Sequence, residues 1–237
     1  MINKLTGKAM HDYRMISKGD KVLVAVSGQD SLSLLDVLQQ KLSYFPIKYT
    51  LIGAHINVNN ANATIIKDFL EERDIKYYIL PLDLNKNRKD IDKTQCFWCS
   101  WKRREALFKL ATRIGCRKIA FAHHMDDIIE SLLLNMLFHG EISTMPPKLK
   151  MFNGRFYIIR PFAYIQKKYI KEYASLKKIP SMPYECPIGK TTNRMLVRRL
   201  LDRLEKEDPR IKKNIFNSMT NIVKNYLPDK PCNAKLV

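Results

Sequence analysis

Long hydrophobic runs are absent from this sequence. No stretch approaches the roughly 20 apolar residues that a membrane-spanning helix requires, and Met1 to His11 lack the apolar core of a signal peptide. We therefore expect a cytoplasmic protein with no membrane partner.

Cysteine is too scarce, and odd in number, for a disulfide framework. The chain has five cysteines in 237 residues, and a chain of this length can bury a core without covalent cross-links. Reduced thiols or metal ligands are the expected states. With 46% hydrophobic and 27% charged residues, the composition predicts one full globular domain and a smaller extension.

Acidic residues are few beside basic ones. The chain carries 23 Asp and Glu against 42 Lys and Arg, a formal net charge of +19. A field of that sign attracts polyanions, so nucleic acid is the expected partner. The alternative is a solvated, lysine-rich surface with no partner.

Apolar runs of strand length alternate with segments of helical spacing. This pattern predicts an α/β fold with βαβ units around a buried parallel sheet. The expected strands are 21–26, 49–56, 75–80, 118–122 and 156–159. The expected helices begin after 31 and span 64–73, 101–114, 128–138 and 166–177, followed by a basic helical region over 192–226 that breaks near Pro209.

These segments divide the chain into four parts. We predict a basic N-terminal segment over 1–19, a nucleotide-binding domain over 20–165, a basic helical region over 166–226 and a tail over 227–237.

The polar loop Ser27-Gly28-Gln29-Asp30-Ser31 separates the first strand from a helix. Its glycine, hydroxyl groups and helix-terminal amides suit a phosphate. Its Ser and Asp residues are equally typical of a helix N-cap. It contains no Gly-Lys-Ser or Gly-Lys-Thr, so it is not a Walker A loop.

A second polar turn, His123-His124-Met125-Asp126-Asp127, follows the strand 118–122. Ligands of open parallel sheets bind beyond the carboxyl ends of the strands, so both turns are expected to line one crevice. The cluster suits a nucleotide with Mg²⁺, with some members capping the next helix. A two-metal phosphohydrolase would need a second His/Asp cluster, which the chain lacks.

Cys96 and Cys99 are three residues apart and precede a basic run. A structural zinc site normally has four protein ligands, whereas a third cysteine in an expected loop is found only at Cys186. We expect Cys116 to be buried and Cys232 to be a bystander. A 4Fe-4S cluster with an open iron suits three thiolates, and a redox-active Cys-x-x-Cys pair remains the alternative.

Together these segments resemble one family. The loop 27–31 is similar to the PP-loop of ATP pyrophosphatases, and 122–127 to its companion loop, both also present in tRNA lysidine synthetases. The run 96–104 is similar to tRNA 2-thiocytidine synthetases, as are Met145-Pro146-Pro147-Lys148, Arg160-Pro161 and Cys186. The likeness spans about 20–226.

The resemblance implies a Rossmann-like sheet of the adenine-nucleotide alpha-hydrolase type with a basic helical C-terminal extension. It implies ATP, Mg²⁺ and a 4Fe-4S cluster on Cys96, Cys99 and Cys186. In the implied reaction, C2 of a cytidine at position 32 of the tRNA anticodon loop is adenylated, and sulfur delivered through the cluster replaces the oxygen. It also implies catalytic roles for Asp127 and Arg103, with Asp30 helping to place the metal ion.

The resemblance further implies which positions meet the substrates. Those expected to contact the nucleotide are Ala25, Ser27, Gly28, Gln29, Asp30, Ser31, His55, Ile56 and His123. Those expected to contact tRNA phosphates are Lys102, Arg104, Lys148, Arg194, Arg198 and Arg199. Phe97, Trp98 and Trp101 either stack on the flipped base or pack in the core. The sulfur comes from a cysteine desulfurase or from free sulfide, and a homodimer is compatible with the family.

One departure from the family concerns the first loop. The family pattern is Ser-Gly-Gly-x-Asp-Ser, whereas this chain has one residue fewer and only Gly28. The shorter loop predicts the loss of one amide from the phosphate cradle. A non-catalytic RNA-binding protein with a degenerate loop therefore remains open. A lysidine-type tRNA ligase without a cluster, which would share the fold, is the other alternative.

Overall fold

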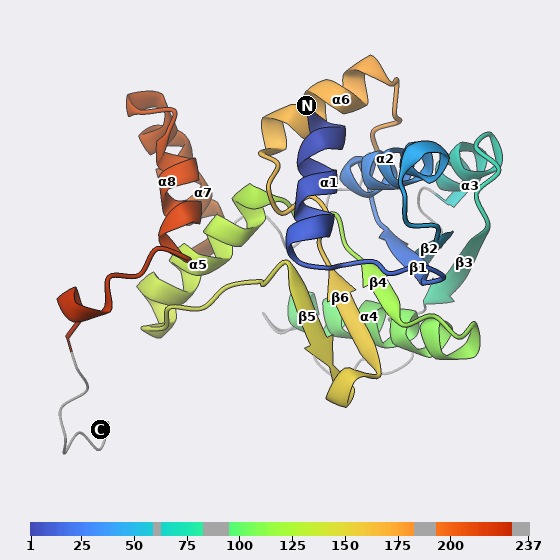
Figure 1. The fold of residues 1–237 in the computed structure, drawn as a ribbon, viewed down its shortest axis with the longest axis horizontal. Helices are drawn as coiled ribbons and strands as arrows, with labels where there is room; N and C mark the ends of the chain where they lie inside the picture. Colours follow the sequence, from blue (N-terminus) through green and yellow to red (C-terminus); the bar gives the residue numbers. More distant parts are fainter. Residues whose placement is uncertain (59–62, 83–94, 183–192, 229–237) are drawn as a thin grey trace.

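The computed structural model describes residues 1–58, 63–82, 95–182 and 193–228, and for 95–97 the backbone alone. Within these residues a central sheet has the strand order β3-β2-β1-β4-β6-β5 (Figure 1). All neighbours pair in parallel except β5, which is antiparallel to β6. The strands are β1 (Lys21–Val26), β2 (Thr50–Val58), β3 (Tyr77–Leu82), β4 (Lys118–Ala120), β5 (Lys148–Met151) and β6 (Phe156–Ile159).

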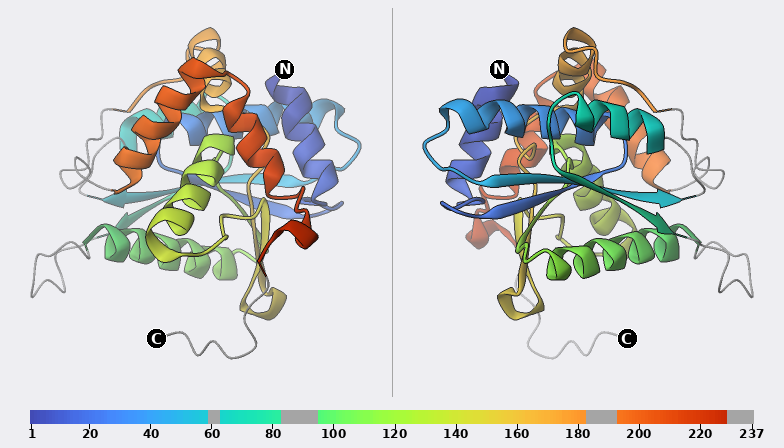
Figure 2. Two further views of the ribbon diagram at one scale, coloured as in Figure 1. Left: turned by 90° about the vertical axis from the view of Figure 1, so that its left-hand side faces the viewer. Right: turned by 90° about the vertical axis from the view of Figure 1, so that its right-hand side faces the viewer.

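Helices cover both faces of the sheet, as the side views show (Figure 2). The helices are α1 (Ile2–Asp12), α2 (Gln29–Tyr44), α3 (Ala63–Glu71), α4 (Gln95–Arg113), α5 (Met125–His139), α6 (Lys167–Leu176), α7 (Asn193–Glu207) and α8 (Ile211–Ser218), with short 3-10 turns at Phe152–Gly154 and Lys224–Tyr226. Helices α1, α2, α3 and α6 pack on one face, and α4 packs on the other. The α/β sheet expected from the sequence is confirmed.

Strand β1 explains why the two layers meet the same sheet. Val22, Val24 and Val26 join the core beneath α2, whereas Leu23 joins the core beneath α4. Successive side chains of a strand point to opposite faces, so a continuous apolar run is required when both faces are covered. The loop after β1 is consequently fixed from both sides.

Helices α5, α7 and α8 form a group beside the sheet, at the left of Figure 1. Their shared core is small and includes Met125, Ile129, Val197 and Leu201. Helix α7 ends at Glu207 and α8 begins at Ile211, which confirms the break expected at Pro209.

The N-terminal residues contain a helix that the sequence reading missed. In α1 the side chains of Ile2, Thr6, Ala9 and Met10 are buried. This i, i+4, i+7, i+8 spacing is typical of an amphipathic helix, and its apolar members join the core shared with α2 and α6. Strand β5 was also not predicted from the sequence.

The cysteine pair lies in a helix rather than in a loop. Helix α4 begins at Gln95, six residues before the expected start at Trp101. Cys96 and Cys99 therefore occupy its first turns, three residues apart, where positions i and i+3 share one side of a helix. Cys186 lies outside the described residues. None of the helices that the structure describes is long and apolar enough to span a membrane.

Candidate nucleotide and substrate site

A cavity of about 430 Å³ opens at the carboxyl ends of β1, β2 and β4. Strands β1 and β4 are neighbours in the sheet, but the chain continues from them to opposite sides. This is the switch point at which open α/β sheets bind ligands. The two polar turns after β1 and β4 meet here, as the sequence predicted.

The lining of this first cavity has an apolar and a charged part. Ala54, Ile56, Leu107 and Phe121 provide apolar surface. The charged side chains are Arg103, Arg104, Lys167 and Lys171 with Asp30 and Asp127. Four cations against two carboxylates favour an anionic ligand, and the apolar surface suits a planar ring.

The loop after β1 is organised by the Ser31 hydroxyl. Its Oγ accepts hydrogen bonds from the backbone N–H groups of Ser27 (2.8 Å) and Gly28 (3.1 Å), and it donates to the Gly28 carbonyl oxygen. The Gln29 amide turns away and donates to the Ile179 carbonyl oxygen at 2.9 Å. The loop thus has the N-cap arrangement and the cavity position that the sequence left as alternatives.

Gly28 has an extended backbone with φ 175°. A Cβ added there would meet no atom within 4 Å, so the space it faces is open to a ligand.

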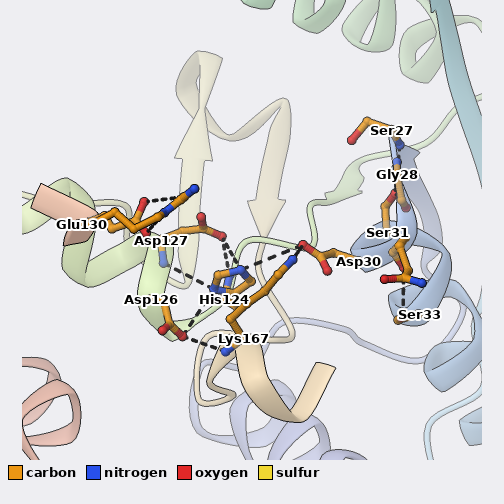
Figure 3. A network of polar contacts seen from close by, with 12 residues as sticks. Ser27, Gly28, Asp30, Ser31, Ser33, His124, Asp126, Asp127, Glu130 and Lys167 are labelled. Atoms are coloured by element: carbon orange, nitrogen blue, oxygen red, sulfur yellow. Dashed lines mark hydrogen bonds and ion pairs between the residues drawn. The ribbon is translucent and has the colours of Figure 1, made fainter. Parts of the chain in front are cut away.

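His124 lies between three carboxylates (Figure 3). Its Nε2 is 3.3 Å from Asp127 Oδ2 and 4.0 Å from Asp30 Oδ2, and its Nδ1 is 3.7 Å from Asp126 Oδ2. The backbone N–H of His124 also donates to Asp127 Oδ2 at 3.0 Å. This imidazole therefore connects the loop after β1 with the start of α5.

His123 is held as a neutral acceptor. Burial, and then the Arg160 guanidinium, lower the pKa of His123 to about 4. Arg160 Nε donates to His123 Nδ1 at 3.2 Å, and the imidazole stacks on Phe121. Burial and the nearby Arg104 charge lower the pKa of Arg160 to about 10. The neutral imidazole keeps its Nε2–H, a hydrogen-bond donor within the first cavity.

Asp126 ties the start of α5 to α6 and α8. Its Oδ2 accepts the Lys167 backbone N–H at 2.7 Å, and its Oδ1 is 3.0 Å from Lys212 Nζ. Burial by itself would raise the pKa of Asp126. The two donors together lower it by more, so the pKa of Asp126 lies below its usual value. Lys212 also contacts Glu205 at 2.5 Å. Although burial opposes its charge, the two carboxylates raise the pKa of Lys212 to about 12.

A second cavity, of about 400 Å³, adjoins the first between α5, α6, α7 and α8. Its lining is almost entirely polar or charged, with Leu201 the apolar exception among the lining residues. Asp30, Asp127, Lys167 and Lys171 line both cavities. Within the second cavity Arg198 forms a bidentate ion pair with Glu130, in which Nε and one terminal nitrogen of the guanidinium donate to the two carboxylate oxygens at 2.8 and 3.0 Å.

The structure gathers most of the expected nucleotide and catalytic residues. The expected residues that line the first cavity are Ala25, Ser27, Gly28, Gln29, Asp30, Ser31, Ile56, Arg103, Arg104, His123 and Asp127. His55 does not line it. The His55 side chain is buried, with Nδ1 2.9 Å from the Val26 carbonyl oxygen, and burial lowers its pKa.

The expected RNA-binding residues are placed less uniformly. Arg194 and Arg199 are exposed on α7, and Lys102 pairs with Glu105 at 3.0 Å while lying 4.8 Å from the Trp101 ring centroid. Trp101 is 49% exposed, which leaves its ring accessible. Lys148 instead donates to the Arg14 carbonyl oxygen, away from both cavities.

Two charged residues of the first cavity were missed by the sequence reading. Lys167 and Lys171 lie on α6, and Lys167 pairs directly with Asp30 (Figure 3). The sequence signal was their i, i+4 spacing in the expected helix 166–177, which alone does not distinguish a site from a solvated face.

Of the three expected cluster ligands, Cys99 is the one whose side chain the structure describes. Cys99 is a half-buried free thiol, and its neighbour Ser100 lines the first cavity. In the part of the chain that the structure describes, no three His, Cys, Asp or Glu side chains form a metal site. Cys99 itself does not line the cavity, and its role as a cluster ligand stays a prediction. Cys116 is buried, as expected, and burial raises the pKa of its thiol.

Comparisons with known proteins agree with this geometry. A family model described as a PP-loop domain matches residues 2–204. The tRNA-cytidine(32) 2-sulfurtransferase of Alcanivorax borkumensis is 36% identical over 235 residues, which cover 96% of this chain and 83% of the relative. That of Pseudomonas fluorescens is 35% identical and covers 97% and 86%.

The chain belongs to the tRNA-cytidine(32) 2-sulfurtransferase family of PP-loop proteins. The family resemblance expected from the motifs is thereby confirmed. Among solved structures, the U34-tRNA thiolase NcsA from Methanococcus maripaludis, described with its [4Fe-4S] cluster, matches with a TM-score of 0.79 at 20% identity. The match covers 98% of this PP-loop protein and 82% of the thiolase, and it supports the shared fold.

Proposed function

We propose that this PP-loop protein is an ATP-dependent tRNA sulfurtransferase that converts an anticodon-loop cytidine, at position 32, to 2-thiocytidine. The observation that carries the proposal is the convergence of the loops after β1 and β4 with Arg103 of α4 on one cavity. The 35–36% identity to proteins named for this reaction, over almost the whole chain, supports it.

The reaction needs activation because the C2 oxygen of cytidine is a poor leaving group. Attack of this oxygen on the α-phosphorus of ATP forms a new P–O bond and releases pyrophosphate. Attack of sulfur at C2 then expels AMP with the original oxygen. The apolar part of the first cavity would take the adenine, while Arg103 would stabilise the charge on the α-phosphate.

Asp30 and Asp127 would hold Mg²⁺ beside the phosphates. Both carboxylates line the two cavities, and His124 lies between them. Carboxylate oxygens together with substrate phosphates are the usual ligands of Mg²⁺. The ion would offset the negative charge that develops as pyrophosphate leaves.

Cys96, Cys99 and Cys186 would hold a 4Fe-4S cluster. When three thiolates bind such a cluster, one iron keeps an open coordination position for a sulfur ligand. In the described part of the chain, Cys99 is the candidate ligand that lies next to the first cavity, through Ser100. Sulfide, either free or derived from a cysteine desulfurase, would supply the sulfur.

The tRNA would approach from the side of α4 and α7. Positive charge without a buried partner is carried there by Lys102, Arg104, Arg194 and Arg199. Contacts of such side chains with phosphates provide most of the affinity for a nucleic acid at low salt. That Lys148 contacts a tRNA phosphate, and that the protein forms a homodimer, stay predictions. The division into a domain over 20–165 and a basic helical region over 166–226, and a cytoplasmic location, likewise stay predictions.

The test is mass analysis of tRNA nucleosides from a strain that lacks the gene, complemented with variants. Loss of 2-thiocytidine in the deletion strain and its return with the wild-type gene are expected. Cys96→Ala and Cys99→Ala should not restore it, whereas Cys232→Ala, the matched control, should. Unchanged 2-thiocytidine in the deletion strain would refute the function.

The second candidate is a non-catalytic RNA-binding protein. It is favoured by the Ser31 hydroxyl, which already accepts the Ser27 and Gly28 amides that a phosphate would use. It predicts tRNA binding with no tRNA-dependent release of AMP or pyrophosphate from ATP, which a phosphate-release assay measures directly.

A further inference from the structure

Two lysines of α6 lie where the two cavities meet. Lys167 and Lys171 line both cavities, and as positions i and i+4 they project from the same side of the helix. The helix itself is fixed, since Ile170 and Ala174 are buried in the core that includes α2. Both ammonium groups are therefore carried on a rigid backbone next to the phosphate loop.

The two lysines differ in their partners. Lys167 Nζ pairs with Asp30 Oδ2. Lys171 forms no ion pair or hydrogen bond within the described part of the chain. The other cations of the second cavity are already matched: Arg198 with Glu130, Lys168 with Glu205, and Lys212 with Asp126 and Glu205. An unmatched positive charge at the junction attracts an anionic group.

The two cavities suit different parts of one ligand. The first offers apolar surface from Ala54, Ile56, Leu107 and Phe121, which suits a base. The second is charged almost throughout, with six carboxylates against five cations, so an anionic group would be attracted to the two lysines at the junction rather than deeper in this cavity. A ligand with a ring at one end and a polyanion at the other would place its anionic end at the junction.

We infer that Lys167 and Lys171 bind the β- and γ-phosphates of ATP where the two cavities meet. The inference rests on the proposed function, because the bond that breaks there joins the α-phosphorus to the bridging oxygen of pyrophosphate. The electron pair of that bond departs with pyrophosphate, and the two ammonium groups offset its charge. Lys167 holds Asp30 while the site is empty and turns to phosphate when Mg²⁺ takes that carboxylate.

The test compares ATP, AMP and inorganic pyrophosphate by isothermal titration with Mg²⁺ and without tRNA, on the anaerobically purified full chain. For Lys171→Met the affinity for ATP and pyrophosphate should fall about tenfold, the scale of one charge-assisted hydrogen bond. Affinity for AMP, which lacks these phosphates, should stay within about twofold. Lys167→Met should act in the same direction but less strongly, because Asp30 competes for this lysine.

Two controls keep the result specific. Lys177→Met removes an exposed lysine just beyond the end of α6 and should leave all three affinities unchanged. Lys171→Arg keeps the charge and should recover ATP binding. Circular dichroism melts of each variant establish that it is folded.

Three outcomes would overturn the inference. Two of them are equal losses for ATP and AMP, and unchanged binding of ATP and pyrophosphate. The third, read by separate filter binding of tRNA, is weakened tRNA binding with ATP affinity intact, which would assign Lys171 to an RNA phosphate. The 2-thiocytidine assay reads the proposed function separately. If the deletion strain keeps its 2-thiocytidine while the lysine variants still lose affinity for ATP and not for AMP, the proposed reaction is wrong. The two lysines would then remain a triphosphate-binding site.

Discussion

The half of the molecule around the first cavity and the half formed by α5, α7 and α8 are held together differently. Strands β1 and β4 and their neighbours are fixed by large apolar cores on both faces. Helices α7 and α8 are attached to α5 by a small apolar cluster and by ion pairs from Glu130 and Asp126. Apolar packing is spread over many side chains, whereas a buried ion pair depends on both of its charged partners. The nucleotide half is therefore preformed, while the C-terminal half depends on charge.

The largest expected effect is a variant of the nucleotide half that loses thiolation activity but keeps its affinity for tRNA. Asp127→Asn keeps an oxygen that can accept the His124 N–H but removes the charge that would bind Mg²⁺. Formation of 2-thiocytidine should fall about 10²–10³-fold, the scale of losing one electrostatic stabiliser, with tRNA affinity nearly unchanged. Single-turnover assays and filter binding measure the two. Asp68→Asn, at an exposed position on α3 that lines neither cavity, is the control, and equal losses in both variants would contradict the assignment.

The next effect concerns attachment of α8. Lys212→Met leaves Asp126 and Glu205 without their shared cation, and removal of one partner from a buried pair is costly. We expect the free energy that holds α8 in place to fall by about 3–5 kcal/mol, seen as early proteolysis in α7 and α8 while the sheet stays protected. Lys213→Met, at the exposed neighbouring position, should behave as wild type. Uniform loss of protection across the chain would mean that the two halves unfold as one unit.

A smaller effect distinguishes two adjacent arginines of α7. Arg199 is exposed, whereas Arg198 is paired with Glu130, which raises the pKa of Arg198. Arg199→Met should lower the slope of log K against log salt for tRNA binding by about 1. Arg198→Met should lower it less, because that charge is already neutralised. Equal slopes in the two variants would place Arg198 on RNA.

The smallest expected effect is a pH dependence from the preformed half. The pKa of His123 is about 4 in the folded chain and about 6.5 when unfolded. The unfolded state binds more protons between these values, so this contribution to stability is complete above about pH 6.5 and is lost as the pH falls towards 4. His123→Gln keeps an acceptor for Arg160 and should reduce the loss of stability between pH 7 and 5 by on the order of 1 kcal/mol. Denaturant titrations at the two pH values measure it, and an unchanged loss would show that His123 is protonated in the fold.

Much of the nucleotide half could be predicted from the sequence, because its signals are local. The continuous apolar run over 21–26 implies a strand buried on both faces, and the polar turns after it and after 118–122 mark strand ends. Parallel strands bring such ends to one edge, so Asp30, His123 and Asp127 were expected together. The start of α4 was misplaced because residues 95–100 follow a polar stretch without periodicity, and their two cysteines were assigned to a loop as candidate metal ligands.

What the sequence determined by itself was the alternation of strands and helices from β1 to α5, the family motifs and the excess of positive charge. Hydrophobic periodicity and motif spacing are properties of residues that are near one another in the chain, so they can be recognised in the sequence without the fold. The tertiary structure alone decided that Lys167 meets Asp30, 137 residues away, that Lys212 meets Asp126, and that His55 turns from the cavity. These contacts depend on how α6 and α8 pack against the sheet and α5, and no local pattern specifies that packing.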